Sequence, residues 1–220
     1  MKKRIFPAAI SFAALLLTVM LPAHAQMDKM NINDKDIFKT TSANDLRTNL
    51  RVLWEDHAMY TRNVILNIID DLPGTNEAVA RLLKNQDDIG DAIKPVYGEA
   101  AGKKLTELLR EHIVIAADLL KAAKVNNQAD FAAVNTKWFK NADDIAVFLS
   151  TANPGNWKLE DMKKMMNEHL NLTTQEAVAR IKKDYKADIE AYDKTRAELL
   201  EMSDMLAAGI IKQFPDQFKK

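Results

Sequence analysis

The chain of 220 residues contains no cysteine. This absence excludes disulfide bonds, thiolate metal sites, iron–sulfur clusters and a nucleophilic thiol. It also excludes covalent attachment of c-type haem, which needs a Cys-x-x-Cys-His segment. The stability of the fold must therefore come from packing.

Glycine and proline are scarce, with six of each. Most of them lie between stretches of helical periodicity, so they mark the ends of elements. The sequence contains no Gly-rich phosphate loop, no dinucleotide fingerprint and no Gly-x-Ser-x-Gly nucleophile elbow. No arrangement typical of a hydrolase or transferase nucleophile is present either, so an enzyme is the less favoured interpretation.

Neither sign of charge is in excess, because the chain has 31 basic and 31 acidic residues. Residues 1–25 hold three of the basic residues and no acid, so the remainder carries 28 basic and 31 acidic residues, a net charge of −3. A weak and mixed charge argues against a nucleic-acid partner, which requires a concentrated basic surface. It gives no reason to expect binding to an anionic membrane.

The N-terminus has the three parts of a secretory signal peptide. Lys2, Lys3 and Arg4 precede an uncharged apolar run over residues 6–21, and Ala23-His24-Ala25 provides a small-x-small cleavage site. The apolar run is shorter than the roughly 20 residues that span a bilayer, which disfavours a retained anchor. We therefore expect cleavage after Ala25, no membrane insertion of the mature chain, and a periplasmic or secreted location.

Residues 26–41 are polar and without a clear period, which predicts a flexible leader. From residue 42 to 220, apolar residues recur every three to four positions, which predicts helices packed in one domain. The expected fold is all-α: an up-and-down bundle of four to five helices with a short extra helix. The extra helix is expected over residues 159–169, followed by a long last helix from about Gln175 to Lys212. Possible capping boxes are Ser42 with Asp45 and Thr173 with Glu176.

Three histidines remain after the predicted cleavage, namely His57, His112 and His169. Each lies on the apolar stripe of a different predicted helix, so each imidazole should point into the bundle. Neutral imidazole binds copper, zinc, iron and nickel, and Met166, three residues before His169, could add a thioether that favours Cu(I). These four residues are the candidate metal ligands, with copper or zinc as the metal. In the alternative interpretation, the histidines are core residues that each satisfy one hydrogen bond.

Other polar residues lie near the stripes or next to the histidines. The Glu-x-x-His pattern of di-iron carboxylate bundles is absent, and the acids Glu55, Glu111 and Glu168 fall on other helix faces than the histidines. Buried polar side chains need partners. A hydrogen-bond network that fixes the packing, or a polar pocket, is therefore expected from these residues: Arg62, Gln86, Asp88, Asn141 and Asp188.

Several motifs spread over most of the mature chain resemble a family of exported bacterial all-helical proteins of unassigned function. They are Leu53-Trp54-x-Asp56-His57 with Thr61-Arg62, residues 85–90 (NQDDIG), Phe148-Leu149-Ser150-x-Ala152-Asn153-Pro154, and Met165-Met166-x-x-His169-Leu170-x-Leu172-Thr173. Relatives are sometimes labelled glycosyltransferase or acetylglutamate kinase, but the nucleotide-binding α/β motifs of such enzymes are missing here. The resemblance also implies a His-x-His in the last helix, where this sequence has Arg196 and Glu198 instead.

Two functions thus remain open. The first is an exported bundle that binds a transition metal through His57, His112, His169 and Met166. The second is a non-catalytic interaction or ligand-sensing bundle of the cell envelope, with a protein partner there and with histidines that serve only the core.

Overall fold

The computed structural model describes residues 37–220, which belong to one compact unit. The predicted signal peptide and all but the last five residues of the predicted leader lie outside the described residues. The described part contains no strand and the following helices: α1 (Thr41–Ile69), α2 (Thr75–Tyr97), α3 (Glu99–Lys124), α4 (Gln128–Ala152), α5 (Leu159–Ile181), α6 (Tyr185–Gln213) and the short 3₁₀ helix η2 (Pro215–Phe218). The all-α prediction is confirmed.

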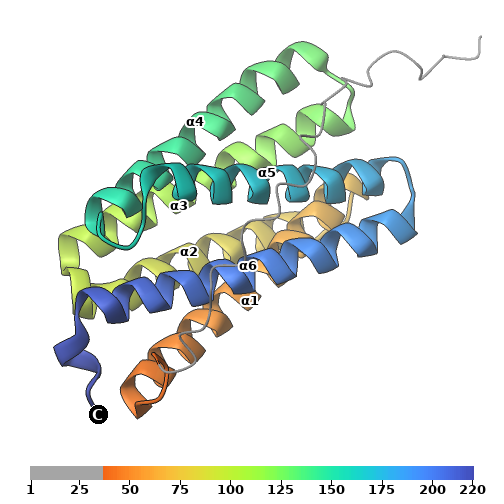
Figure 1. The fold of residues 1–220 in the computed structure, drawn as a ribbon. Coiled ribbons are helices and arrows are strands. Elements are labelled where there is room, and N and C mark those ends of the chain that lie inside the picture. Colours follow the sequence, from red (N-terminus) through yellow and green to blue (C-terminus); the bar gives the residue numbers. More distant parts are fainter. Residues whose placement is uncertain (1–36) are drawn as a thin grey trace, which may run out of the picture. The chain divides into compact units, whose positions relative to one another are not determined.

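The six long helices form a closed bundle. Each helix packs against the next one in the chain, α6 returns to pack against α1, and consecutive helices run in alternating directions (Figure 1). α1 also contacts α3 and α5, so one side of α1 borders the interior of the bundle. All six helices therefore border the core, where a bundle of four to five helices with a short extra helix had been expected.

The expected short helix before residue 173 was wrong. α5 continues through Thr173 to Ile181, and the chain turns at Lys183, which has a φ of 59°. The Thr173 hydroxyl does not cap a helix but donates to the carbonyl of His169, 2.9 Å away within α5. A threonine inside a helix can satisfy its hydroxyl in this way, so the Thr-x-x-Glu pattern alone does not mark a helix start. The cap of α6 is Asp184, whose carboxylate accepts from the backbone N–H of Ala187.

The other predicted ends shift by a few residues. Thr40, not Ser42, caps α1 by accepting from the backbone N–H of Ala43. Pro95 lies inside α2, which ends two residues later at Tyr97. The next residue, Gly98, has a φ of 85° that suits glycine. Gly98 therefore allows the chain to turn sharply from α2 into α3.

A pair of glycines lets α2 and α3 approach closely beside this turn. A Cβ on Gly90 would lie 2.7 Å from the carbonyl oxygen of Gly102, and a Cβ on Gly102 would lie 2.6 Å from that of Gly90. This contact holds α2 and α3, which carry Gln86 and His112, against each other.

Within residues 37–220, no helix combines the length and the apolar character needed to cross a bilayer.

Candidate functional site

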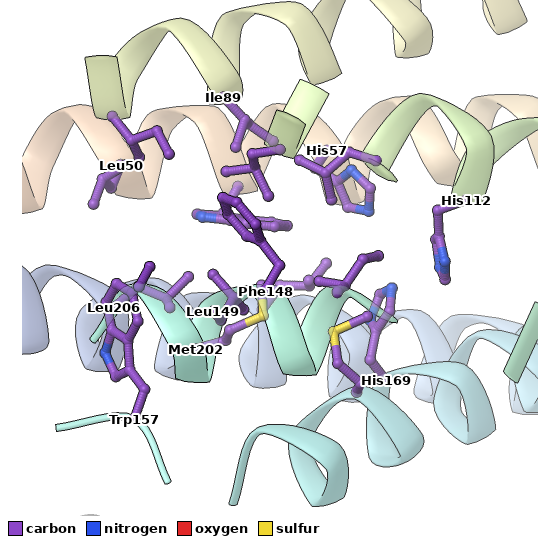
Figure 2. A pocket seen from close by; sticks show the side chains of 18 of the residues that line it. Leu50, His57, Ile89, His112, Phe148, Leu149, Trp157, His169, Met202 and Leu206 are labelled. Atoms are coloured by element: carbon purple, nitrogen blue, oxygen red, sulfur yellow. The ribbon is translucent and has the colours of Figure 1, made fainter. Parts of the chain in front are cut away.

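The three histidines of the bundle meet in its interior. His57 lies on α1, His112 on α3 and His169 on α5, and each is less than one-tenth exposed. The ring centroid of His169 lies 5.9 Å from that of His57 and 6.3 Å from that of His112. Figure 2 shows the three rings reaching into one space from three helices. The predicted inward orientation and the convergence on one depth of the bundle are both present in the structure.

His112 is held by Asn141 of α4. The Nδ2 of Asn141 donates to the carbonyl of Leu108 (3.2 Å) and contacts the Glu111 carboxylate (3.4 Å), so its Oδ1 faces Nδ1 of His112 at 2.7 Å. An amide oxygen only accepts, so Nδ1 carries the ring proton. The lone pair is therefore on Nε2, which is buried and has no hydrogen-bond partner among the described residues.

His169 is held by a carboxylate. Its Nδ1 lies 3.2 Å from Oε2 of Glu198 on α6, whose side chain is 9 % exposed. A carboxylate partner favours the proton on Nδ1 and again directs the lone pair to Nε2. A histidine that donates Nδ1–H to a carboxylate or an amide oxygen and presents Nε2 is the arrangement seen for metal-bound histidines.

His57 is held by two buried amides of α2. The Nε2 of Gln86 lies 3.2 Å from Nδ1 of His57 and also donates to the carbonyl of Leu82 and to Oδ1 of Asn85. Asn85 in turn donates to the carbonyl of Leu53 on α1. Gln86 and Asn85 are both 0 % exposed, so the position of the His57 ring is fixed by α2.

A narrow internal cavity of about 50 Å³ opens beside the imidazoles. His57, His112, His169 and Met166 all line it, so all four predicted ligands are brought together. The rest of the lining is apolar or aromatic. Its members include the following: Trp54, Ile89, Leu109, Ile145, Phe148, Leu149, Trp157 and Leu206.

Burial holds the imidazoles in the neutral form. Burial, reinforced by the charge that His169 would carry, lowers the pKa of His57 to about 3. Burial and the same neighbour lower the pKa of His112 to about 3, against the weaker effect of its hydrogen bond to Asn141. Two of the three rings are therefore uncharged at neutral pH, and a neutral imidazole is the form that binds a metal.

The three rings stand too far apart to share one ion without movement. Within residues 37–220, no three side chains of His, Asp or Glu form a group that could hold a metal ion as they stand. With metal–nitrogen bonds of about 2.0 Å, two imidazoles on one tetrahedral ion have centroids about 5 Å apart. The observed 5.9 and 6.3 Å exceed this spacing, so the rings would have to move toward one another to share one ion.

A separate group of buried charges lies beside this site. Arg62 of α1 binds Glu176 of α5 at 2.7 Å and Asp188 of α6 at 2.8 Å, and both carboxylates are 1 % exposed. Arg180 also reaches Asp188, at 3.4 Å, and the Arg62 guanidinium lies over the Tyr192 ring. Burial raises the pKa of Glu176 to about 7, although Arg62 opposes the rise. The polar network is thus only partly as predicted. Arg62 and Asp188 belong to it together with Glu176, which is not a helix cap, whereas Gln86 and Asn141 hold histidines and Asp88 pairs with Lys84 near the surface.

The sequence reasoning did not identify Glu198 as part of the site. Of the acids next to the histidines in sequence, Glu55 pairs with Arg196 at the surface and Glu111 contacts Asn141. Glu198 lies seven residues after Ala191 and seven residues before Met205, and both Ala191 and Met205 are buried. This spacing would have indicated that Glu198 faces the interior.

Comparisons of the chain with protein-family models, with curated proteins and with solved structures found no match. The resemblance noted in the sequence therefore stays a prediction, and the site has to be interpreted from its own geometry.

Proposed function

We propose that the bundle binds one transition-metal ion through Nε2 of His57, His112 and His169, with the Met166 thioether as a weaker fourth ligand. The proposal rests above all on the convergence of three imidazoles from three helices on one cavity. Two of them are oriented through Nδ1 by an oxygen acceptor, so their Nε2 lone pairs are available. The unpartnered Nε2 of His112 supports the same assignment, because a buried polar atom without a partner is costly unless something binds it.

His57 acts as the third ligand only if its partner Gln86 rearranges. Binding through Nε2 requires the ring proton on Nδ1, which faces the Gln86 amide. Rotation of that amide by half a turn would let Oε1 accept from Nδ1–H, at the cost of the two hydrogen bonds that Nε2 donates to the Leu82 carbonyl and to Oδ1 of Asn85. All three imidazoles would then have the same arrangement, with an oxygen at Nδ1 and the metal at Nε2.

Copper(I) fits this set of ligands better than zinc does. No carboxylate oxygen lines the cavity, and the soft thioether of Met166 is suited to Cu(I). The Glu198 carboxylate behind His169 balances a single positive charge, whereas a divalent ion would leave one charge uncompensated in an apolar interior. With the predicted signal peptide, the protein would be a copper-binding bundle of the periplasm or the exterior.

A metal titration tests this function. Metal-free protein is expected to bind one equivalent of Cu(I) in the presence of a chromophoric competitor, and the triple variant His57→Gln/His112→Gln/His169→Gln is expected to bind none. Glutamine keeps a polar side chain of similar length, and a circular dichroism spectrum shows whether the variant is folded. A folded triple variant with unchanged stoichiometry would eliminate the site. The histidines would then be core residues, and a bundle that acts through a protein partner would be the remaining interpretation.

The role of Met166 can be tested against a neighbour on the same helix. Met166→Leu is expected to weaken Cu(I) binding about tenfold and to leave Zn(II) binding nearly unchanged, because only the thioether is lost. Met162→Leu is the control, since Met162 is also buried on α5 but does not line the cavity. Equal effects of the two variants on Cu(I) affinity would show that Met166 acts only through packing.

A further inference from the structure

The internal cavity is long and narrow, and it runs along the axis of the bundle. Its lining residues on α6 extend from Leu199 to Ile210, which is about 16 Å of helix at about 1.5 Å per residue. Figure 2 shows Phe148 in the middle of this space, with the histidines on one side and Leu206 on the other. About 50 Å³ of it is open to the centre of a water-sized sphere. Spread over about 16 Å, this volume gives a passage about one methylene group wide.

The passage has its mouth at one end of the bundle. Four of its described lining residues are half-exposed, and they form two pairs one helical turn apart: Ile93 and Tyr97 at the end of α2, and Phe148 and Ala152 at the end of α4. The Tyr97 hydroxyl donates to Oε1 of Gln213, whose Nε2 donates to the Ala152 carbonyl, so two hydrogen bonds join the pairs through α6. The other lining residues, the three histidines included, are buried. The imidazoles therefore lie at the inner end of the passage.

The wall of the passage is almost entirely apolar. Leucine, isoleucine, methionine and aromatic side chains make up most of it, and it contains no aspartate, glutamate, lysine or arginine. A cavity of this kind stays dry and takes up apolar molecules. Wall atoms that face empty space lack the dispersion contacts of a packed core, so an apolar occupant adds contacts. Hydrocarbon therefore suits the passage, whereas a hydroxyl, amide or charged group would lose its water there without an adequate replacement.

We propose that the passage binds the unbranched aliphatic chain of a single-chain lipid, with the methyl end against the imidazoles and the polar head in water at the mouth. An extended chain advances about 1.2 Å per bond, so about 16 Å corresponds to roughly 13 carbons. Met166 and Met202 line the passage, and their flexible side chains can shift to make room for the chain. This inference goes beyond the proposed function and does not depend on a bound metal.

Straight-chain fatty acids of 8 to 16 carbons are the probes. Each is titrated by calorimetry into the metal-free protein at pH 8, with a chelator present and below the concentration at which the acid forms micelles. Each methylene added up to about 12 carbons should tighten binding about fourfold, because burial of one methylene stabilises by about 0.8 kcal/mol. Beyond about 14 carbons the chain protrudes from the mouth, and the affinity should level off. An affinity that does not depend on chain length, or that rises evenly up to 16 carbons, would overturn the inference.

A substitution in the middle of the passage should shorten the chain that fits. Phe148→Trp places a larger ring there and is expected to weaken dodecanoate binding at least tenfold and to move the levelling-off to shorter acids. Phe139→Trp on the same helix is the matched control and should have no effect, because Phe139 is also half-exposed but does not line the passage. Equal dodecanoate affinities of Phe148→Trp and the wild type would contradict the proposed position of the chain.

The position of the chain can also be tested in the wild type. With dodecanoate carrying ¹³C in its terminal methyl group, nuclear Overhauser effects are expected between that methyl group and the ring protons of His57, His112 and His169. Effects only with exposed side chains would overturn the inference. Absence of saturable dodecanoate binding would overturn it as well and would leave the proposed function intact. A failed Cu(I) titration would overturn the proposed function alone, because the fatty acids are bound by metal-free protein.

Discussion

Acidification from pH 6.5 to pH 3 is expected to destabilise the metal-free protein by about 7 kcal/mol, which is comparable with the whole stability of a typical domain. The cause is the burial of His57 and His112, whose pKa values fall from 6.5 to about 3. The unfolded chain takes up a proton on each of these histidines below pH 6.5, whereas the folded chain does not do so until about pH 3. Their contribution is therefore complete above pH 6.5 and is lost as the pH falls.

Glu176 acts in the opposite direction over part of this range. Its pKa is raised from 4.5 to about 7, so the folded protein binds a proton there that the unfolded chain does not bind until pH 4.5. Each unit of pH changes the free energy by about 1.4 kcal/mol per proton. Between pH 6.5 and 4.5, the glutamate offsets one of the two histidines, so the free energy of unfolding falls by about 1.4 kcal/mol per unit of pH. Below pH 4.5, Glu176 is protonated in both states and both histidines count, so the fall is about twice as steep. The effect of the histidines is therefore the larger one, and stability falls more steeply the lower the pH.

Urea unfolding followed by circular dichroism at half-unit steps from pH 7 to pH 3, with a chelator present, measures this profile. His112→Gln removes one of the two titrating groups and is expected to halve the slope below pH 4.5. The comparison uses slopes rather than absolute stabilities, so a constant cost of the substitution does not disturb it. A free energy of unfolding that stays level between pH 6.5 and 4 would contradict the burial of the imidazoles.

The sequence predicted the inward direction of the histidines because this depends only on helical spacing. His57, His112 and His169 each lie on a stripe of apolar residues, and the stripe faces the core whatever the partner helix is. Their common depth depends on how far each helix slides along its neighbours. That register is set by contacts such as the close approach of Gly90 and Gly102, which join residues from different helices. Spacing within one helix carries no information about it.

The network of buried charges was predicted less well for a related reason. Asp188 lies on the apolar stripe of α6 and was expected in a network. Glu176 was assigned to a helix start because it follows Thr173 by three residues, a spacing that also occurs inside helices. The structure places it in the interior of α5, at 1 % exposure, where only Arg62 from another helix makes its burial tolerable. A pairing between α1 and α5 over 114 positions leaves no local pattern in the sequence.

Replacement of Arg62 should therefore be among the most damaging single changes in the chain. Arg62→Met removes the guanidinium shared by Glu176 and Asp188 and leaves two buried carboxylates, with only Arg180 near one of them. Breaking a buried ion pair in this way typically costs about 3–5 kcal/mol, because the remaining charge has neither water nor a partner. Urea unfolding of the metal-free variant at pH 8 measures the cost.

Arg81→Met is the matched control for this prediction. Arg81 also pairs with a carboxylate, that of Asp56, and also lies over a tyrosine ring, that of Tyr60, but both charged groups of this pair are about one-third exposed. Such a pair contributes at most about 1 kcal/mol, so the control should lose little stability. The loss in Arg62→Met should also shrink at pH 5, where Glu176 can take up a proton, and the loss in Arg81→Met should change much less. Similar losses in the two variants at pH 8 would mean that water reaches the carboxylates beside Arg62. In that case their burial would not explain the raised pKa of Glu176.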